Sequence, residues 1–166
     1  MDSSVEQMWR NYCVESGRTG APRPDAWHFC DNQEDANTCA ALVLAGKKRA
    51  TASSLWSYEA GGRASPTIGD LHIVTDWSGV AQCIIRITHT EIVAFEDIDA
   101  EHALAEGEGD GSLEWWRREH WAYYQRGLSV IGRVPTPNMP LVFERFEVVY
   151  PPMRRAENRR CRLIGG

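Results

Sequence analysis

Lys48 and Thr51 are two residues whose types and spacing could support chemistry. They follow the apolar stretch LVLAG, where a helical pattern gives way to an extended one. A lysine amine acts as a base once partial burial lowers its pKa, and a hydroxyl beside such a base becomes a nucleophile. A purely structural interpretation also stands, because cations complement the C-terminal end of a helix and threonine suits a strand. The residues alone leave both interpretations open.

Helical patterns precede this corner, and extended patterns dominate after it. SSVEQMWRNYCVESG and EDANTCAALVLAG have helical spacing and end in glycine, at Gly17 and Gly46. ATASSLWSY, LHIVTD, VAQCIIRITHTEIVAF and LVFERFEVVY are typical of strands, and DIDAEHALAEGEG and SLEWWRREHWAYYQRG predict further helices. Because the strands cluster instead of alternating with helices, we expect an α+β fold, a small and mostly antiparallel β-barrel surrounded by helices.

Charge is distributed unevenly along the 166 residues, whose formal net charge is −5. Residues 153–166 contain five arginines and one glutamate, a local balance of +4 that leaves −9 for residues 1–152. Long nucleic acid binds nonspecifically through lysine and arginine, so a body this acidic binds it poorly. Any role with nucleic acid needs a local cationic pocket or the arginine-rich tail, which we expect to be disordered.

The sequence also bears on the compartment. It has no apolar run long enough to span a bilayer, and its N-terminus lacks the basic and then apolar pattern of a secretory signal. Five cysteines without a C-x-x-C pair indicate reduced thiols. We therefore expect a cytoplasmic protein of one domain that does not contact a membrane.

Aromatic residues concentrate in EWWRREHWAYYQRG. Aromatic side chains stack on unpaired bases, but a stripe at helical spacing more often packs into a core. We expect one residue of this segment, Tyr123 or Tyr124, to reach a binding cleft, and the same alternatives apply to Trp56 and Tyr58.

No metal site and no cofactor can be read from the sequence, although a divalent metal stays possible. Its five histidines show no H-x-x-x-H or H-E-x-x-H spacing. Glu106, Glu108 and Asp110 are close enough in sequence to hold magnesium together with an RNA phosphate, but acidic loops are usually just solvated.

GKKRATAS resembles the G-x-K-x-x-T-x-[RS] signature of the ASCH domain family, a branch of the PUA-like β-barrel superfamily. SLWSYEAGG, PTIGDLHIVTDWSG, DIDAEHALAEGEGDGSLEWWRREHW and MPLVFERFEVVY are similar to segments of the longer bacterial members, in the same order. The resemblance covers about residues 27–150. It implies an N-terminal helix and loop over 1–26, an ASCH domain over 27–152 and a tail over 153–166.

The resemblance implies a cleft that receives RNA or a nucleoside. Some members of the family are amidohydrolases that use a lysine, a threonine and a glutamate. The resemblance places the lysine and threonine at Lys48 and Thr51. It places the glutamate, which belongs to an A-E-x-E segment, at Glu108, with Glu106 as the alternative. Thr51 would attack, Lys48 would activate it, and Glu108 would orient the lysine or move protons.

The family often has arginine where this chain has Ser53. The anion contact of that arginine is therefore in question, and Arg49 or Lys47 would have to supply it.

Three functions follow from the resemblance. The first is hydrolysis of single-stranded RNA, slightly favoured because the longer branch is matched. The second is removal of the acetyl group from N4-acetylcytidine, and the third is RNA binding without catalysis. The partner is accordingly single-stranded RNA or a modified nucleoside.

Overall fold

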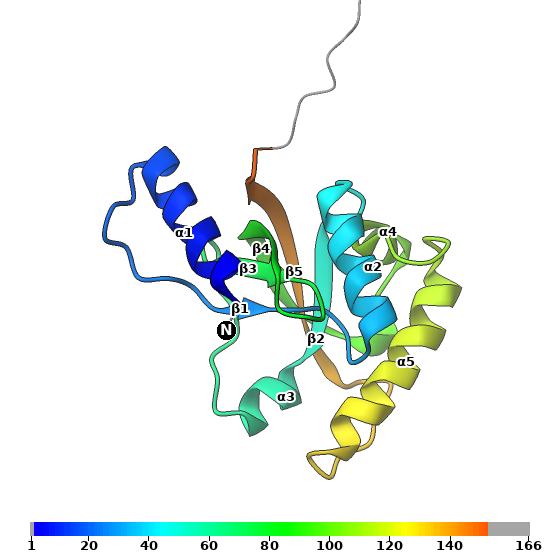
Figure 1. The fold of residues 1–166 in the computed structure, drawn as a ribbon. Helices are drawn as coiled ribbons and strands as arrows, with labels where there is room; N and C mark the ends of the chain where they lie inside the picture. Colours follow the sequence, from blue (N-terminus) through cyan, green and yellow to red (C-terminus); the bar gives the residue numbers. More distant parts are fainter. Residues whose placement is uncertain (1, 153–166) are drawn as a thin grey trace, which may run out of the picture.

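A computed structural model describes residues 2–152, so the tail expected over 153–166 lies outside the described residues. The chain forms an α+β fold (Figure 1). Its helices are α1 (Ser3–Ser16), α2 (Gln33–Leu44), α3 (Leu55–Ala60), the 3₁₀ helix η1 (Phe95–Asp97), α4 (Ala100–Glu106) and α5 (Leu113–Ser129). Its strands are β1 (Ala26–Trp27), β2 (Ala50–Ser54), β3 (Leu71–Thr75), β4 (Ala81–Ala94) and β5 (Pro140–Tyr150).

The five strands form one mixed sheet in the order β1-β3-β4-β5-β2. Only β1 and β3 run parallel, and the other three pairings are antiparallel. The expectation of a barrel is wrong, because β1 and β2 are the two edges of the sheet and do not pair with each other. A closed barrel would require backbone pairing between β1 and β2. Instead, side chains from both edge strands, including Trp27 and Thr51, line a cavity.

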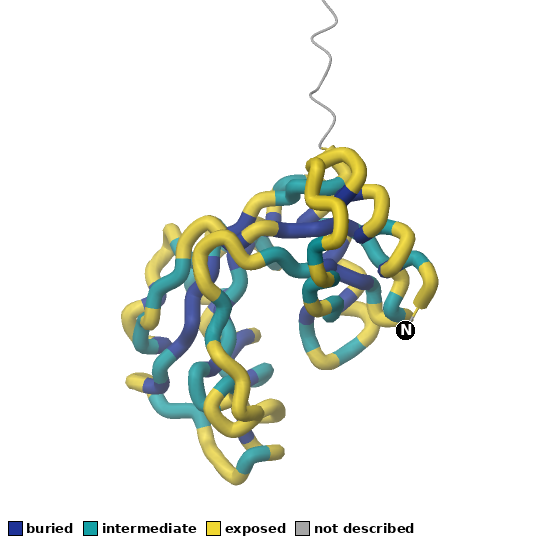
Figure 2. Tube along the Cα trace, turned by 90° about the vertical axis from the view of Figure 1, so that its left-hand side faces the viewer, coloured by how far each residue is buried: buried dark blue, intermediate teal, exposed yellow. Residues whose placement is uncertain are grey.

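Helices cover the sheet and bury its apolar side chains in three clusters. The α5 cluster includes Trp116, Tyr124 and Phe143, the α2 cluster includes Val43, Ile85 and Phe146, and the α1 cluster includes Trp9, Tyr12 and Ile84. The buried stretches run through the inside of the arched chain (Figure 2). Within residues 2–152, no helix combines the length and apolar character needed to cross a membrane.

The predicted helix boundaries around the corner are close to those observed. Asn32 caps α2 by accepting a hydrogen bond from the backbone of Asp35, and Gly46 has the left-handed backbone (φ 70°) expected after the helix. The strand predicted over ATASSLWSY is only partly present. It ends at Ser54, and Leu55 begins the six-residue helix α3.

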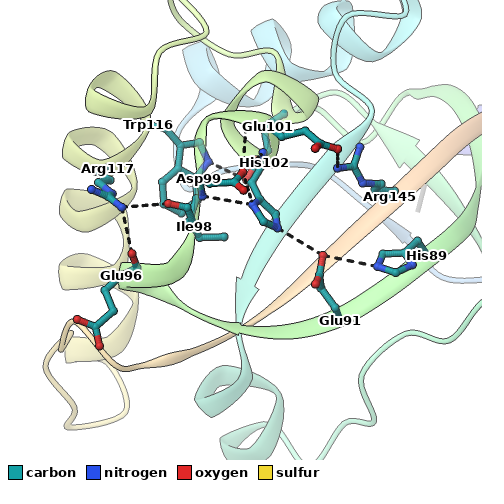
Figure 3. Close-up of polar contacts among 11 residues, drawn as sticks. His89, Glu91, Glu96, Ile98, Asp99, Glu101, His102, Trp116, Arg117 and Arg145 are labelled. Carbon is teal, nitrogen blue, oxygen red and sulfur yellow. Dashed lines mark hydrogen bonds and ion pairs between the residues drawn. The ribbon is translucent and has the colours of Figure 1, made fainter.

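Polar contacts fix helix α4, whose last residue is Glu106 (Figure 3). Asp99 caps its N-terminus, accepting hydrogen bonds from the backbone of Glu101 and His102. The ring of His102 lies between Asp99, 2.7 Å from Nδ1, and Glu91 of β4, 3.4 Å from Nε2. These contacts tie the start of α4 to the sheet.

Two arginines from neighbouring elements complete this support (Figure 3). Arg117 of α5 donates to the carbonyl oxygens of Glu96 and Ile98 at 3.0 Å, in the turn that precedes α4. Arg145 of β5 lies 2.9 Å from the carboxylate of Glu101. Helix α4 is thus held by β4, β5 and α5, and the position of Glu106 is fixed with it.

Candidate active site

A cavity of about 640 Å³ lies between the sheet edges and the helices, and it brings together the residues of the predicted site. Lys48, Thr51, Glu106 and Glu108 all line it. They come from the corner after α2, from β2 and from the end of α4. The backbone amide of Arg49 donates to the carbonyl of Ala105 at 2.8 Å, so the corner and the end of α4 are directly joined.

The ammonium group of Lys48 is enclosed by carboxylates. The residue is only 2% exposed, and Nζ donates to Oε2 of Glu106 at 2.9 Å and to Oε1 of Glu108. The ring of Phe29 lies 5.1 Å from Nζ. Glu106 and Glu108 therefore both contact Lys48, so these contacts do not distinguish which of the two corresponds to the glutamate of the family.

Lys48 is a permanent cation in this setting. Burial on its own lowers the pKa of the amine, but the charges of Glu106 and Glu108 outweigh it and raise the pKa above the ordinary value. Burial raises the pKa of Glu106, but Lys48 and His120 oppose it and hold this pKa at about 2. The raised pKa keeps the amine protonated near neutral pH, which argues against Lys48 as the base that activates Thr51.

Glu106 is further held by helix α5. Its Oε1 accepts a hydrogen bond from Nε1 of Trp116 at 2.9 Å, and its Oε2 lies 3.6 Å from Nε2 of His120. The rings of Trp116 and His120 stack with centroids 4.0 Å apart. Every oxygen of this buried carboxylate thus faces a donor, as a buried charge requires.

Gly107 allows both glutamates to reach one lysine. Its backbone is left-handed (φ 64°), and a Cβ atom there would collide with the carbonyl group of Lys47. Only glycine suits both the turn and the close approach, so the G of AEGE is a structural requirement of the ion cluster.

Glu144 lies beside Thr51 and was not predicted from the sequence. The two residues are paired in the antiparallel β2–β5 ladder, and both line the cavity. Glu144 is 2% exposed and accepts a hydrogen bond from the hydroxyl of Tyr58 at 3.2 Å. Burial raises the pKa of Glu144 to about 7, and the charge of Glu106 adds to the effect. The available signal was an acid within the apolar strand pattern LVFERFEVVY.

Three other predicted binding residues line the cavity, namely Ser53, Tyr58 and Tyr123. Ser53 lies on the same face of β2 as Thr51, since alternate residues of a strand share a face. Burial raises the pKa of Tyr123 to about 12, so its phenol stays neutral. The structure thus extends the site from the lysine corner to helix α5.

Four predicted binding residues lie outside the cavity. Tyr124 is a core residue that is 2% exposed and donates to the carbonyl of Ala52 at 2.9 Å. Trp56 packs against the α5 cluster, with the guanidinium of Arg133 4.6 Å from its ring. Lys47 and Arg49 are exposed and do not line the cavity. Nε of Arg49 donates to the carbonyl of Gly46 at 2.7 Å, so this guanidinium is engaged at the corner and not in the cavity.

His72 is a second lining residue that the sequence did not indicate. Both of its ring nitrogens are buried, and neither has a hydrogen-bond partner within the described residues. Burial lowers the pKa of this imidazole, which is therefore neutral at pH 7. The ring of Trp27 lies 5.8 Å away. Unpaired buried nitrogens in a cavity wall suit a polar ligand, because such groups are rarely left unsatisfied.

The charged groups that line the cavity are mostly acidic. The acids are Asp25, Asp31, Asp35, Glu106, Glu108, Glu119 and Glu144, and the cations are Lys48, Arg63 and Arg126. Lys48 neutralises part of the acidic charge, and Arg126 forms two hydrogen bonds of 2.7 and 3.0 Å with Asp31. Acids therefore outnumber cations among the lining residues, seven to three.

Glu106, Glu108 and His120 also form a donor set suited to a divalent cation, with ligand atoms within 4.8 Å of one another. In this arrangement the ammonium of Lys48 contacts both carboxylates. A metal ion bound by all three residues would have to displace that ammonium group.

The comparison with known proteins agrees with this architecture. The family model of the ASCH domain matches residues 25–150. This chain belongs to the ASCH domain family. The crystal structure of an ASCH domain from Lactobacillus crispatus JV V101 is 32% identical, with a TM-score of 0.82, and the match covers 89% of this chain and 95% of that one. No curated protein matches the sequence.

A second solved structure is equally similar to this chain. The Enterococcus faecalis V583 protein assigned to DUF984 is 33% identical with a TM-score of 0.82, and the match covers 90% of each chain. The ASCH fold of the present protein is thus shared with bacterial proteins of nearly the same extent.

Proposed function

We propose that this ASCH protein is a hydrolase that removes an acyl group from an acylated nucleoside such as N4-acetylcytidine. The observation that supports the proposal is the pairing of Thr51 with Glu144, a carboxyl group whose pKa is about 7, in a cavity that also contains the ammonium of Lys48. A group with a pKa near the working pH is effective both as a base and as an acid.

The reaction uses these three residues in sequence. The Glu144 carboxylate accepts the proton of the Thr51 hydroxyl, whose oxygen attacks the amide carbonyl carbon. The permanent charge of Lys48 stabilises the negative charge that develops on the carbonyl oxygen. Glu144 then gives its proton to the leaving amine, which departs as the free nucleoside. Water, deprotonated by the same carboxylate, hydrolyses the Thr51 ester and releases the acid.

The cavity favours a small and neutral substrate. A volume of about 640 Å³ is in the usual range for a small-molecule site, and the acidic lining disfavours a polyanion. Trp27 and Tyr123 provide aromatic surface for a base, and the neutral ring of His72 has a donor and an acceptor for a polar edge.

Incubation of the purified protein with N4-acetylcytidine, followed by chromatography of cytidine and acetate, tests the proposal. We expect turnover by the wild type and by Thr51→Ser, and loss of turnover in Thr51→Val, which lacks the nucleophile. Thr88→Val is the matched control, because Thr88 is exposed on β4 and outside the cavity. Wild-type turnover retained in Thr51→Val would refute the role of the hydroxyl.

Cleavage of single-stranded RNA is the second candidate, favoured by two exposed arginines that line the cavity, Arg63 and Arg126. In this reaction Lys48 stabilises charge on the phosphate and Glu144 accepts the proton of the 2′-hydroxyl. Labelled RNA with and without chelator tests it. Fragments that disappear in Glu144→Gln, without release of acetate from acetylcytidine, would place this reaction first. Binding without turnover of either substrate would support a binding module.

A further inference from the structure

Cys30, in the wall of the cavity, lies beside a second thiol, that of the buried Cys39. Cys30 follows β1 and lines the cavity, and Cys39 lies on α2. Their sulfur atoms are 3.6 Å apart. We propose that these two residues are a redox modification site, which a peroxide converts into a disulfide that alters the cavity.

The backbone at Cys30 is unusual. Among residues 2–152, Cys30 is the one non-glycine residue with a left-handed backbone (φ 60°). This conformation is unfavourable for a side chain with a Cβ atom, and such outliers concentrate at functional sites. The chain therefore retains a strained cysteine at the point where its thiol meets a second thiol.

The two thiols differ in access, which assigns their roles. Cys30 is half-buried and faces the cavity, whereas Cys39 is 2% exposed and packs in the α2 cluster. The hydrogen bond with Cys30, and then burial, raise the pKa of Cys39, so this thiol stays protonated. A peroxide small enough to enter the cavity reaches Cys30 first, and Cys39 is the resolving thiol.

The reaction balances in two steps. The Cys30 sulfur attacks one peroxide oxygen, the O–O bond breaks, and the thiol proton of Cys30 goes to the departing hydroxide, so a sulfenic acid and one water form. The Cys39 sulfur then attacks the Cys30 sulfur, forming the S–S bond and breaking the S–O bond. The departing hydroxide takes the proton of Cys39 and leaves as a second water. Both sulfurs are oxidised by one electron each, and the peroxide is reduced to two waters.

We expect formation of the disulfide to change contacts in the cavity through the two residues that flank Cys30. An S–S bond of about 2.05 Å requires the sulfurs to approach each other by about 1.5 Å. Phe29, on one side, has its ring 5.1 Å from the Lys48 ammonium. Asp31, on the other, forms both hydrogen bonds with Arg126. We expect the bridge to move both contacts and to lower turnover until it is reduced.

Mass spectrometry of the folded protein tests the bridge directly. Cys161, which lies outside the described residues, is first replaced by serine. The protein is treated with hydrogen peroxide, its free thiols are blocked with N-ethylmaleimide, and the chain is cleaved after Glu34, which separates Cys30 from Cys39. We expect the two peptides to remain linked, with a mass lower by two hydrogen atoms, and to separate after dithiothreitol.

Matched variants decide the outcome. Cys39→Ser should abolish the link and leave a sulfenic acid on Cys30, which dimedone traps, whereas Cys13→Ala, at a buried thiol on α1, should not change it. A link that forms only in urea, or separately alkylated Cys30 and Cys39 after peroxide, would overturn the proposal. The mass readout and hydrogen exchange of residues 26–32 require no substrate, so they stand even if the proposed deacylation fails.

Discussion

Thr51 and Glu144 occupy directly opposed positions in the β2–β5 ladder. Opposed residues of an antiparallel pair place their side chains on the same face, with Cβ atoms about 4.5–5.5 Å apart. A hydroxyl and a carboxyl group with a pKa of about 7 are thereby held together by the backbone pairing of two strands, and not by a flexible loop. This rigidity suits general base catalysis, where the distance for proton transfer must be maintained.

The pH dependence of turnover should report Glu144. Because its pKa is about 7, the fraction present as carboxylate, and with it the rate, should rise as the pH increases through 7. Glu144→Gln removes the base, and we expect the rate to fall by about 10²–10⁴-fold. Initial rates from pH 5 to 9 check this. A Glu144→Gln variant with the wild-type profile would exclude Glu144 as the base.

The same carboxyl should make the folded protein less stable as the pH rises. Its pKa is about 7 when folded and has a reference value of 4.5, so the unfolded chain loses this proton first. The contribution of Glu144 to the free energy of unfolding is therefore fully present below about pH 4.5. It falls by about 3 kcal/mol as the pH rises to 7. Urea unfolding should show that Glu144→Gln, which stays neutral, gains stability relative to wild type across this interval. A constant difference would contradict the raised pKa.

Tyr58→Phe should shift the pH profile in a defined direction. The hydroxyl of Tyr58 donates to Glu144 at 3.2 Å, and this hydrogen bond lowers the pKa of the carboxyl against the larger effect of burial. Its removal should therefore move the rise in rate to higher pH. Tyr12→Phe, at a buried position of helix α1 outside the cavity, is the control and should leave the midpoint unchanged. A shift to lower pH would show that the bond does not stabilise the carboxylate.

The sequence predicted the positions that local patterns determine. Gly17 and Gly46 located the C-terminal ends of α1 and α2, and Lys48, Thr51 and Glu108, which the resemblance indicated, line one cavity. Helix α3 was not predicted, because its six residues follow directly on a strand pattern and Ser54 makes no side-chain cap. The remaining differences involve contacts between distant parts of the chain.

Contacts between distant parts of the chain determine the protonation of Lys48, the open edge of the sheet and the role of Glu144. The protonation of Lys48 depends on carboxylates 58 and 60 residues further along the chain, and neither charge can be assigned to the lysine from local spacing. Whether the sheet closes depends on pairing between β1 and β2, which no local pattern in either strand specifies. The role of Glu144 likewise follows from its register with Thr51.

Lys48→Met should destabilise the protein strongly. It leaves Glu106 buried without its cation, and breaking a buried ion pair in this way typically costs about 3–5 kcal/mol. The neighbouring Lys47→Met is a matched control at an exposed position, where substitutions usually change stability by less than about 0.5 kcal/mol. Urea unfolding at pH 7 measures both. The double variant Lys48→Met/Glu106→Gln should recover part of the loss, and a loss equal to the single variant's would argue against the ion pair.

Gly107→Ala should damage the ion cluster without replacing any charged residue. A left-handed backbone costs a residue with a Cβ atom about 1–2 kcal/mol, and here the added carbon also collides with the carbonyl group of Lys47. The chain must shift between Glu106 and Glu108, so both carboxylates move relative to Lys48 and turnover should fall. Gly62→Ala has a similar φ of 61° with open space around its Cβ, so it isolates the cost of the backbone conformation. We expect urea unfolding to show a larger loss for Gly107→Ala than for Gly62→Ala. Equal losses, with turnover unchanged, would mean that the turn between the two glutamates does not set their distance from the lysine.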